Sequence, residues 1–363
     1  MKFSEEFRDH DLVRRLARRL GELSSGPATL MEVCGTHTMA VARFGLKNLL
    51  PPELRLVSGP GCPVCVTAQE DIDAFLALRA LPGVILATFG DMVRVPGSVT
   101  SLERERARGV QVRVVYAPLD AVALAQEHPE RQVIFFAVGF ETTMPATAVA
   151  VKEAVRRGVE NFSVFSVHKT MPAALRALLA SGEVQIHGLL LPGHVTTIIG
   201  PEAFEFIPRD FHLPCAVTGF EPLDILQGLA ALLEMRTRGD FRVENAYRRA
   251  VPAAANPRAQ ALLAEVFEPA DARWRGLGLI PGSGAALRQA FARHDARRRF
   301  AEVVAAVPPA PPGACRCGEV LRGVLRPREC PLFDTACSPP RPLGPCMVSS
   351  EGACAAAYKY ERG

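Results

Sequence analysis

The chain has 363 residues, 48% of them hydrophobic and 22% charged, which excludes a wholly disordered or fibrous protein. This length predicts two or three domains and a core that needs no disulfides for its stability. The formal net charge of +4 at pH 7 is small and argues against a dedicated nucleic-acid-binding protein.

No segment reaches the roughly 20 consecutive apolar residues that a membrane span requires. The N-terminal segment is charged throughout and lacks the apolar core of a secretion signal. The sequence therefore predicts a cytoplasmic protein with no membrane contact. Because thiols stay reduced in that compartment, the ten cysteines are expected to bind a metal or take part in catalysis.

Residues 1–23 are expected to form an amphipathic helix that packs on the rest of the protein. After it, short apolar runs each end in a small polar loop, and a helix-like stretch follows each loop. Such runs predict parallel strands that are buried on both faces. The loops begin at Cys34, Gly59, Gly90, Gly139, Pro192 and Gly219. Ligands bind beyond the carboxyl ends of parallel strands, so we expect these loops to form one functional rim.

The order of these elements predicts two Rossmann-like parallel-sheet α/β domains, over residues 24–117 and 118–222. From residue 223 the pattern becomes helical, with the last of these helical stretches over 283–304. A proline-rich connector then leads to about fifty residues rich in cysteine, proline and glycine. We therefore expect a third domain over 223–363, mainly helical and irregular, whose last part needs a metal centre or docking onto the rest.

Six of the ten cysteines lie in this last part, at Cys315, Cys317, Cys330, Cys337, Cys346 and Cys354. No histidine follows His294, which excludes a mixed Cys/His zinc finger within the tail. An all-cysteine zinc site or an iron–sulfur cluster remains, and the alternative is a set of unligated thiols. The spacing lacks the paired CxxC hairpins of a zinc ribbon.

Cys62 and Cys65 form a CxxC motif between a predicted strand and a predicted helix, as in dithiol oxidoreductases. Thr67 and Glu70 have the spacing of a capping box, which predicts that the helix starts just after Cys65. A helix N-terminus favours thiolate over thiol, so one of the two cysteines would be a better nucleophile or ligand. Half a zinc site, or two buried small residues, would look the same.

Cys34 is a third candidate, because it ends an apolar run and precedes a predicted helix on the same rim. Taken alone, such a cysteine is usually inert core, and His37 beside it is more often structural than a ligand. Cys215 lies inside an apolar run and is interpreted as core. The polar residues expected on the rim include Asp91, Glu141, His168, Lys169 and His194. No phosphate-binding loop motif is present, so nucleotide binding is unsupported.

Together these stretches resemble the HypD family of hydrogenase maturation proteins. The resemblance is carried, from about residue 30 to 360, by MEVCGTHTMA (31–40), SGPGCPVCVT (58–67), FGDMVRVPGS (89–98), VGFETT (138–143), LPGHVTTIIG (191–200), VTGFEP (217–222) and the tail CPLFDTACSPP…GPCMVSSEGACAAAYKY. One departure is Asp334, where the family pattern leads us to expect glycine.

The resemblance implies two α/β domains and a third domain that carries a [4Fe–4S] cluster. It also implies a scaffold on which the Fe(CN)₂CO group of [NiFe]-hydrogenase is built together with a HypC-type chaperone. A HypE-type partner would deliver cyanide as a thiocyanate, and the finished group would pass to the hydrogenase large subunit.

Carried over to this sequence, the resemblance makes Cys34 the thiolate that holds the nascent iron, and Cys62 and Cys65 a redox-active dithiol. The cluster ligands would be Cys330, Cys337, Cys354 and either Cys315 or Cys317, with Cys317 preferred and Cys346 spare. Proton delivery or positioning of the carrier is expected of His37, Asp91, Glu141, His168 and His194.

Two other functions fit parts of the pattern. A stand-alone, cluster-fed dithiol oxidoreductase would need the CxxC motif and the cluster, but it gives Cys34 no task. A zinc-stabilised binding module would explain the tail cysteines alone.

Overall fold

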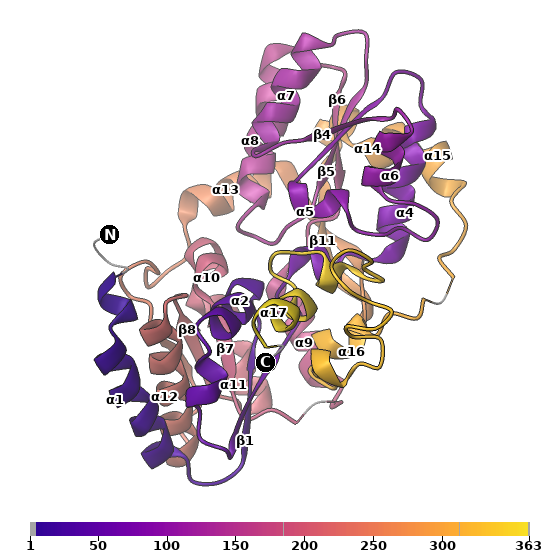
Figure 1. The fold of residues 1–363 in the computed structure, drawn as a ribbon. Helices are drawn as coiled ribbons and strands as arrows, with labels where there is room; N and C mark the ends of the chain where they lie inside the picture. The colour runs from indigo at the N-terminus through magenta and orange to yellow at the C-terminus, as the bar shows by residue number, and fades with distance from the viewer. Residues whose placement is uncertain (1–4, 184, 312, 362–363) are drawn as a thin grey trace.

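The computed structural model describes residues 5–183, 185–311 and 313–361, and it contains two parallel β-sheets that lie in separate lobes (Figure 1). The first sheet has the strand order β2-β1-β7-β8-β9, with β1 (Ala28–Glu32), β2 (Leu54–Ser58), β7 (Leu189–Pro192), β8 (Cys215–Thr218) and β9 (Val243–Asn245). The second has the order β4-β3-β5-β6, with β3 (Ile85–Thr88), β4 (Gln111–Val114), β5 (Val133–Ala137) and β6 (Phe162–Ser166). The parallel pairing confirms the predicted α/β class.

The strands are not divided between the sheets as expected from their order in the chain. The first sheet takes strands from residues 28–58 and again from 189–245, and the second sheet is formed in between. The expected domain boundary between residues 117 and 118 is therefore wrong, because β4 before it and β5 after it belong to the same sheet. Apolar runs look alike whichever strand they pair with, so the sequence pattern did not reveal that β1 pairs with β7.

Helices cover both sheets. The N-terminal helix α1 (His10–Leu23) packs on α12 (Pro222–Arg238), as expected of residues 1–23, of which residues 1–4 lie outside the described part. The helices that precede or follow rim loops are α2 (Gly35–Arg43), α3 (Pro63–Val66), α4 (Gln69–Ala77), α5 (Gly90–Val93), α6 (Leu102–Ala107), α7 (Pro118–Glu127), α8 (Met144–Arg157), α9 (Met171–Ala180), α10 (Gly193–Ile199) and α11 (Phe206–Phe211). In the described residues, no helix combines the length and the apolar character needed to cross a membrane.

The segment after residue 266 differs from the predicted run of helices. After α13 (Pro257–Val266), the chain forms an antiparallel hairpin of β10 (Phe267–Trp274) and β11 (Gly278–Leu287). The helix expected over 283–304 is thus wrong at its start, and only short helices such as α14 (Ala296–Arg299) and α15 (Ala301–Ala305) follow. Leu287 is buried against the second sheet, and Ser283 accepts a 2.8 Å hydrogen bond from the Trp274 indole, so tertiary contacts override local helix propensity.

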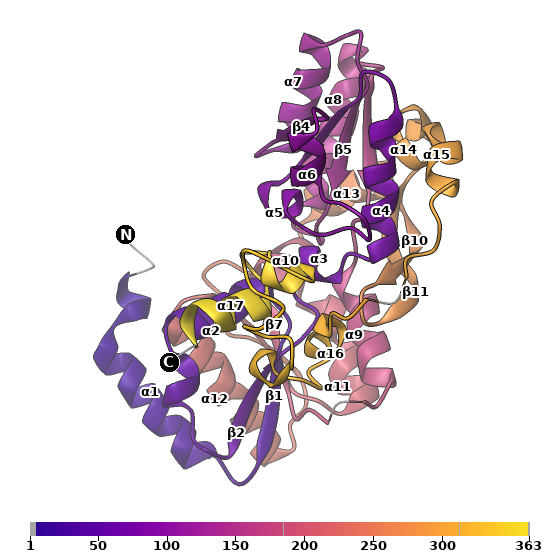
Figure 2. The ribbon, with the colours of Figure 1, turned by 45° about the vertical axis from the view of Figure 1, so that its right-hand side comes forward.

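The cysteine-rich tail lies between the lobes. It carries α16 (Cys317–Leu321), a 3₁₀ turn at Pro345–Met347 and α17 (Ala353–Tyr360). Figure 2 shows this yellow segment over α2 and α3, and α17 contacts α2 while α16 contacts α3. The tail therefore docks onto the rim of the first sheet, which is one of the two alternatives expected for it.

Candidate functional site

Cys34 lies beyond the carboxyl end of β1, at the residue before α2, and its side chain is only 1% exposed. Its Sγ is 3.8 Å from Nδ1 of His194, which follows the neighbouring strand β7. Burial, and to a lesser extent the Glu351 carboxylate, raises the pKa of the Cys34 thiol. Burial also lowers the pKa of His194 to about 4, so both shifts favour a neutral thiol beside a neutral imidazole.

Two glycines allow three segments to meet at Cys34. A Cβ on Gly61 would lie 2.1 Å from the backbone nitrogen of Cys34, and the Gly35 N–H donates to the Gly61 carbonyl at 2.9 Å. A Cβ on Gly35 would lie 2.5 Å from Cβ of Glu351 in the tail. The CxxC loop and the tail can therefore approach Cys34 only because these positions have no side chain.

Cys62 and Cys65 are joined by a disulfide in this structure, at the start of α3. The Cys65 N–H points to Sγ of Cys62 at 3.1 Å. The predicted helix start is wrong, because α4 begins at Gln69 after an Ala68 cap that offers no side-chain hydrogen bond. Thr67 does not cap it, since its hydroxyl donates to the carbonyl of Pro63.

The tail loop of residues 349–351 connects the two thiol sites to Asp91, at the start of α5. Ser349 Oγ lies 3.5 Å from Cys62 Sγ and 3.1 Å from Asp91 Oδ2, which also accepts from the Ser350 N–H at 2.8 Å. Glu351 accepts a 2.7 Å hydrogen bond from Thr36, two residues after Cys34, and burial raises its pKa. Asp91 therefore holds a loop rather than facing Cys34.

Sequence reasoning did not single out Ser349 and Glu351 as site residues. Both lie in the tail stretch that carries the family resemblance, and this was the one signal that pointed to them. Their distance of more than 280 residues from the CxxC motif gave no local pattern that would place them at the rim.

His37 contacts the end of β8 rather than the Cys34 thiol. Its Nε2 is 2.9 Å from both the Gly219 carbonyl oxygen and Thr218 Oγ1, and its Nδ1 has no hydrogen-bond partner among the described residues. Burial lowers its pKa to about 4. Phe220 lies between the two histidines, with ring centroids 4.9 Å from His37 and 5.1 Å from His194, so His37 reaches His194 through a shared aromatic contact.

Glu141 and His168 belong to the second sheet, and none of their hydrogen bonds in the described structure involves the Cys34 site. Glu141 Oε1 accepts from the N–H of Met171, the first residue of α9, at 2.8 Å. His168 lies 3.0 Å from the Thr147 hydroxyl, and burial lowers its pKa to about 4. These contacts hold the segment between β6 and α9 in place.

The buried Glu141 carboxyl should make the stability of the protein depend on pH. Its second oxygen is buried without a partner among the described residues, and burial raises its pKa to about 7 from 4.5. The folded state then binds the proton more tightly, so stability is lost as pH rises from about 4.5 to 7. We expect Glu141→Gln to stabilise the protein by about 3 kcal/mol at pH 8 and by almost nothing at pH 4. Urea unfolding of both proteins at the two pH values measures this, and an equal effect at both would contradict it.

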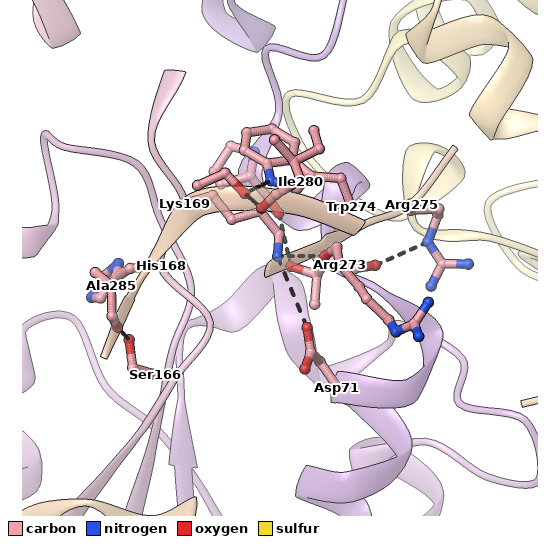
Figure 3. A network of polar contacts seen from close by, with 12 residues as sticks. Asp71, Ser166, His168, Lys169, Arg273, Trp274, Arg275, Ile280 and Ala285 are labelled. Atoms are coloured by element: carbon pink, nitrogen blue, oxygen red, sulfur yellow. Dashed lines mark hydrogen bonds and ion pairs between the residues drawn. The ribbon is translucent and has the colours of Figure 1, made fainter. Parts of the chain in front are cut away.

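Lys169 forms a polar network between the lobes (Figure 3). Its side chain is 2% exposed, and Nζ donates to the Arg273 carbonyl oxygen at 2.8 Å and lies 3.9 Å from Asp71 Oδ2. Asp71 also pairs with Arg297 at 2.5 Å, and the ammonium lies 5.6 Å from the Trp274 ring centroid. The network borders a cavity of about 640 Å³ and joins α4 to the hairpin, apart from Cys34.

Five tail cysteines line one small cavity, namely Cys315, Cys317, Cys330, Cys337 and Cys354. Among the described residues the side chains do not form a group in metal-binding geometry. The donor set nevertheless fits an iron–sulfur cluster, because thiolates are its usual ligands. Gly344 also leaves space there, since a Cβ at this position would lie 2.3 Å from Cys315 Sγ.

Cys346 is the sixth tail cysteine and lies on the buried side of this group, outside the cavity lining. It is 1% exposed and forms hydrogen bonds with the thiols of Cys317 and Cys354. Hydrogen bonds from Cys315 and Cys346 hold the pKa of Cys317 well below its usual value. The thiols of Cys315, Cys317 and Cys346 therefore form one hydrogen-bonded group beside the cavity.

The cavity adjoins the CxxC motif. Both α16, which starts at Cys317, and the turn that contains Cys346 contact α3. Arg275 interacts with both α3 and α16. Its backbone N–H donates to the Val66 carbonyl at the end of α3, and its charge lowers the pKa of Cys317 at the start of α16. Asp334 in the tail has φ 58°, a left-handed conformation that favours glycine, which explains why glycine was expected there.

Known proteins of one family match this chain over almost its whole length. The HypD family model, described as "Hydrogenase formation hypA family", matches residues 11–361. The chain is 47% identical to "Hydrogenase maturation factor HypD" of Azotobacter vinelandii, over 100% of this chain and 97% of that protein. It is 46% identical to the protein of the same name from Escherichia coli (strain K12), over 100% and 99% of the two chains. The chain therefore belongs to the HypD family and is a hydrogenase maturation factor.

Proposed function

We propose that this protein is the cytoplasmic scaffold and redox site on which the Fe(CN)₂CO group of [NiFe]-hydrogenase is assembled. It would act with a HypC-type chaperone and receive cyanide from a HypE-type carrier, in a complex rather than as a free-standing enzyme. The observation that carries the proposal is the meeting of the Cys34 thiol, the Cys62–Cys65 disulfide and the tail loop at one rim.

Cys34 supports the role of iron anchor. A thiol must lose its proton to bind iron, and the iron itself would lower the pKa of the thiol, with the His194 imidazole 3.8 Å away to relay the proton. Burial keeps the thiol protonated until a metal arrives, which protects it from oxidation. Thiolate is a soft ligand, suited to an iron that also carries cyanide and carbon monoxide.

Cys62 and Cys65 support a redox role, because their sulfurs are already close enough to be bonded. The reduced pair would give two electrons to a thiocyanate on the carrier and become the disulfide. The carbon–sulfur bond of the thiocyanate breaks, cyanide leaves with one electron pair, and the carrier sulfur becomes a thiolate. The two thiol protons pass to the products.

The implied [4Fe–4S] cluster would be held by four of the five thiols that line the tail cavity and would supply electrons one at a time when bound. Cys330, Cys337 and Cys354 are the proposed ligands, with Cys317 preferred over Cys315 because Cys317 starts α16, the helix that contacts α3. The contacts of α16 with α3 bring this cavity next to the disulfide.

Cys346 tests this choice of ligands. We expect Cys346→Ala to leave the iron and acid-labile sulfide content of anaerobically purified protein unchanged, because Cys346 does not line the cavity. The matched variant Cys330→Ala should lose most of both. Loss of iron in Cys346→Ala with full iron in Cys330→Ala would reverse the assignment.

The experiment for the proposed function is infrared spectroscopy of the chain purified without oxygen together with its HypC-type chaperone. Iron-bound cyanide and carbon monoxide absorb where protein is nearly transparent. We expect bands of both ligands in the wild-type complex. Absence of bands from protein with an intact tail cluster would count against the scaffold role.

The disulfide also favours a second candidate, a cluster-fed dithiol oxidoreductase. That enzyme would reduce protein disulfides at a rate that does not depend on Cys34. Turnover of a model disulfide at equal rates by wild type and Cys34→Ala would support it. Zinc without acid-labile sulfide in the anaerobic protein would instead point to a zinc-stabilised binding module.

A further inference from the structure

The turn between β10 and β11 lies next to both the CxxC helix α3 and the tail helix α16 (Figure 2). On one side, Trp274 forms an antiparallel bridge with Thr67, the residue that follows α3. On the other side, a Cβ on Gly276 would lie 2.4 Å from the Cα of Gly318, the residue after Cys317. The turn therefore touches the backbone beside the disulfide and the backbone beside the tail cavity.

The contact with α16 is close because both residues in it are glycines. Gly276 has a left-handed φ of 82°, and a side chain at either Gly276 or Gly318 would meet the backbone of the other. The Gly276 carbonyl also accepts a hydrogen bond from the guanidinium of Arg322, at the end of α16. Both ends of α16 are thus fixed to the turn.

Arg275 in this turn binds the segment that follows the disulfide. Its backbone N–H donates to the Val66 carbonyl at 2.9 Å. Its side chain donates from Nε to the Thr67 carbonyl at 3.0 Å and from Nη2 to Oε1 of Gln69 at 3.1 Å. One residue therefore holds the end of α3 and the start of α4 together.

The charge of Arg275 is not balanced by these contacts, because all three acceptors are neutral. Arg275 is half-buried and forms no ion pair with a carboxylate in the part of the chain that the structure describes. Arg316, which lines the tail cavity, differs in this respect, since its Nε donates to the Glu319 carboxylate at 2.7 Å. Burying a cation without a nearby negative charge costs free energy, so Arg275 calls for a negative group beside it.

A cluster on the tail cysteines would supply that negative charge. Thiolate ligands give an iron–sulfur cluster a net negative charge that grows when the cluster is reduced, and net charge is one of the factors that set its reduction potential. A nearby cation stabilises the more negative, reduced state and so raises that potential. The charge of Arg275 already acts on this group, since it lowers the pKa of the Cys317 thiol.

We propose that Arg275 is a positioning residue shared by the two thiol centres. Its hydrogen bonds to Thr67 and Gln69 hold the disulfide segment beside the tail cavity, and its guanidinium offsets the negative charge of a cluster bound there. This inference rests on the proposed function, which places the cluster in that cavity. It adds a residue outside the ligand set that sets the potential of the cluster.

A redox titration tests the charge. The full-length variants Arg275→Gln and Arg275→Lys are purified without oxygen, with Arg273→Gln as the matched control, because Arg273 is an exposed arginine of the same hairpin. The midpoint potential of the cluster is measured by visible absorption. We expect Arg275→Gln to shift it to more negative values, and Arg275→Lys and Arg273→Gln to stay close to wild type. An unchanged potential in Arg275→Gln, or an equal shift in either of the others, would overturn the proposal.

The rate of disulfide reduction tests the hydrogen bonds. Both Arg275→Gln and Arg275→Lys lose the guanidinium contacts, so the CxxC segment should open more easily. We expect a water-soluble phosphine to reduce the Cys62–Cys65 disulfide about tenfold faster in both, as the loss of a hydrogen bond to a charged group predicts. Gln69→Ala removes one acceptor and keeps the charge, so it should raise this rate less and leave the cluster potential unchanged. Wild-type reduction rates in both Arg275 variants would overturn the proposal.

The infrared measurement separates this inference from the proposed function. A cluster potential that depends on Arg275, without iron–cyanide bands, would support this inference and overturn the scaffold role. Bands in the wild-type complex, with a potential that does not depend on Arg275, would leave the scaffold role and overturn this inference. Wild-type protein without iron and acid-labile sulfide would overturn this inference whatever the infrared result.

Discussion

We expect Cys34→Ala to abolish the infrared bands of iron-bound cyanide and carbon monoxide and to leave the visible absorption of the tail cluster at the wild-type level. The reason is that the proposed cluster ligands are the cysteines that line the tail cavity, and Cys34 is not one of them. Alanine removes the one sulfur that lies 3.8 Å from the His194 imidazole. The loss should be complete, since no other free cysteine of the described residues lies directly at the carboxyl end of β1.

Cys215→Ala is the matched control for this experiment. Cys215 is also a fully buried free cysteine at the first sheet, and burial raises its pKa as it does that of Cys34. It lies inside β8, however, and not at the rim. Full bands in Cys215→Ala with none in Cys34→Ala would support the assignment. Bands retained in Cys34→Ala, or a loss of cluster absorption there, would contradict the division of roles.

Gly61→Ala is the second substitution with a large expected effect. The added Cβ would lie 2.1 Å from the Cys34 nitrogen and 2.3 Å from its Cα, so the contact is with backbone that cannot rotate away. We expect the protein to lose about 3 kcal/mol of stability or more, or the CxxC loop to move away from Cys34. Urea unfolding measures the first effect, and iodoacetamide labelling of Cys34 at pH 8 measures the second.

Gly21→Ala is the control for the glycine prediction. Gly21 lies in α1 with nothing within 4 Å of an added Cβ, so alanine there should stabilise the protein by about 0.5–1 kcal/mol. Gly61→Ala with wild-type stability and wild-type labelling of Cys34 would show that the two loops are not in the contact described.

Local sequence patterns predicted much of the fold. The apolar runs before Cys34, Gly90 and His194 are parallel strands, and the polar loops after them lie at carboxyl ends of strands, as expected. These predictions succeed because a strand buried on both faces needs a continuous apolar run, which is a local property. The hairpin at β10 and β11 was missed because β11 carries small residues and is held by distant contacts, such as the hydrogen bond from the Ser166 hydroxyl to the Ala285 carbonyl.

In the candidate site, too, local sequence predicted some residues and tertiary contacts decided others. The sequence named Cys34, Cys62, Asp91 and His194 from their loops, and the CxxC spacing allowed the disulfide that the structure contains. It also placed Glu141 and His168 near Cys34, whereas their hydrogen bonds lie within the second sheet and at the start of α9. Residues of one rim look equivalent in sequence, but two sheets give two rims, and only strand pairing decides on which one a residue lies.

By itself, then, the sequence determined the family, the α/β class, the strand ends that carry the thiols and the need of the tail to dock or bind a metal. Only the tertiary structure decided that β1 lies beside β7, that Gly61 lets the CxxC loop touch Cys34, and that Ser349 and Glu351 complete the rim. The physical reason is that residue type records burial locally, whereas strand pairing and close backbone approach depend on contacts between segments that are separate in the chain, such as those of Cys34 and His194.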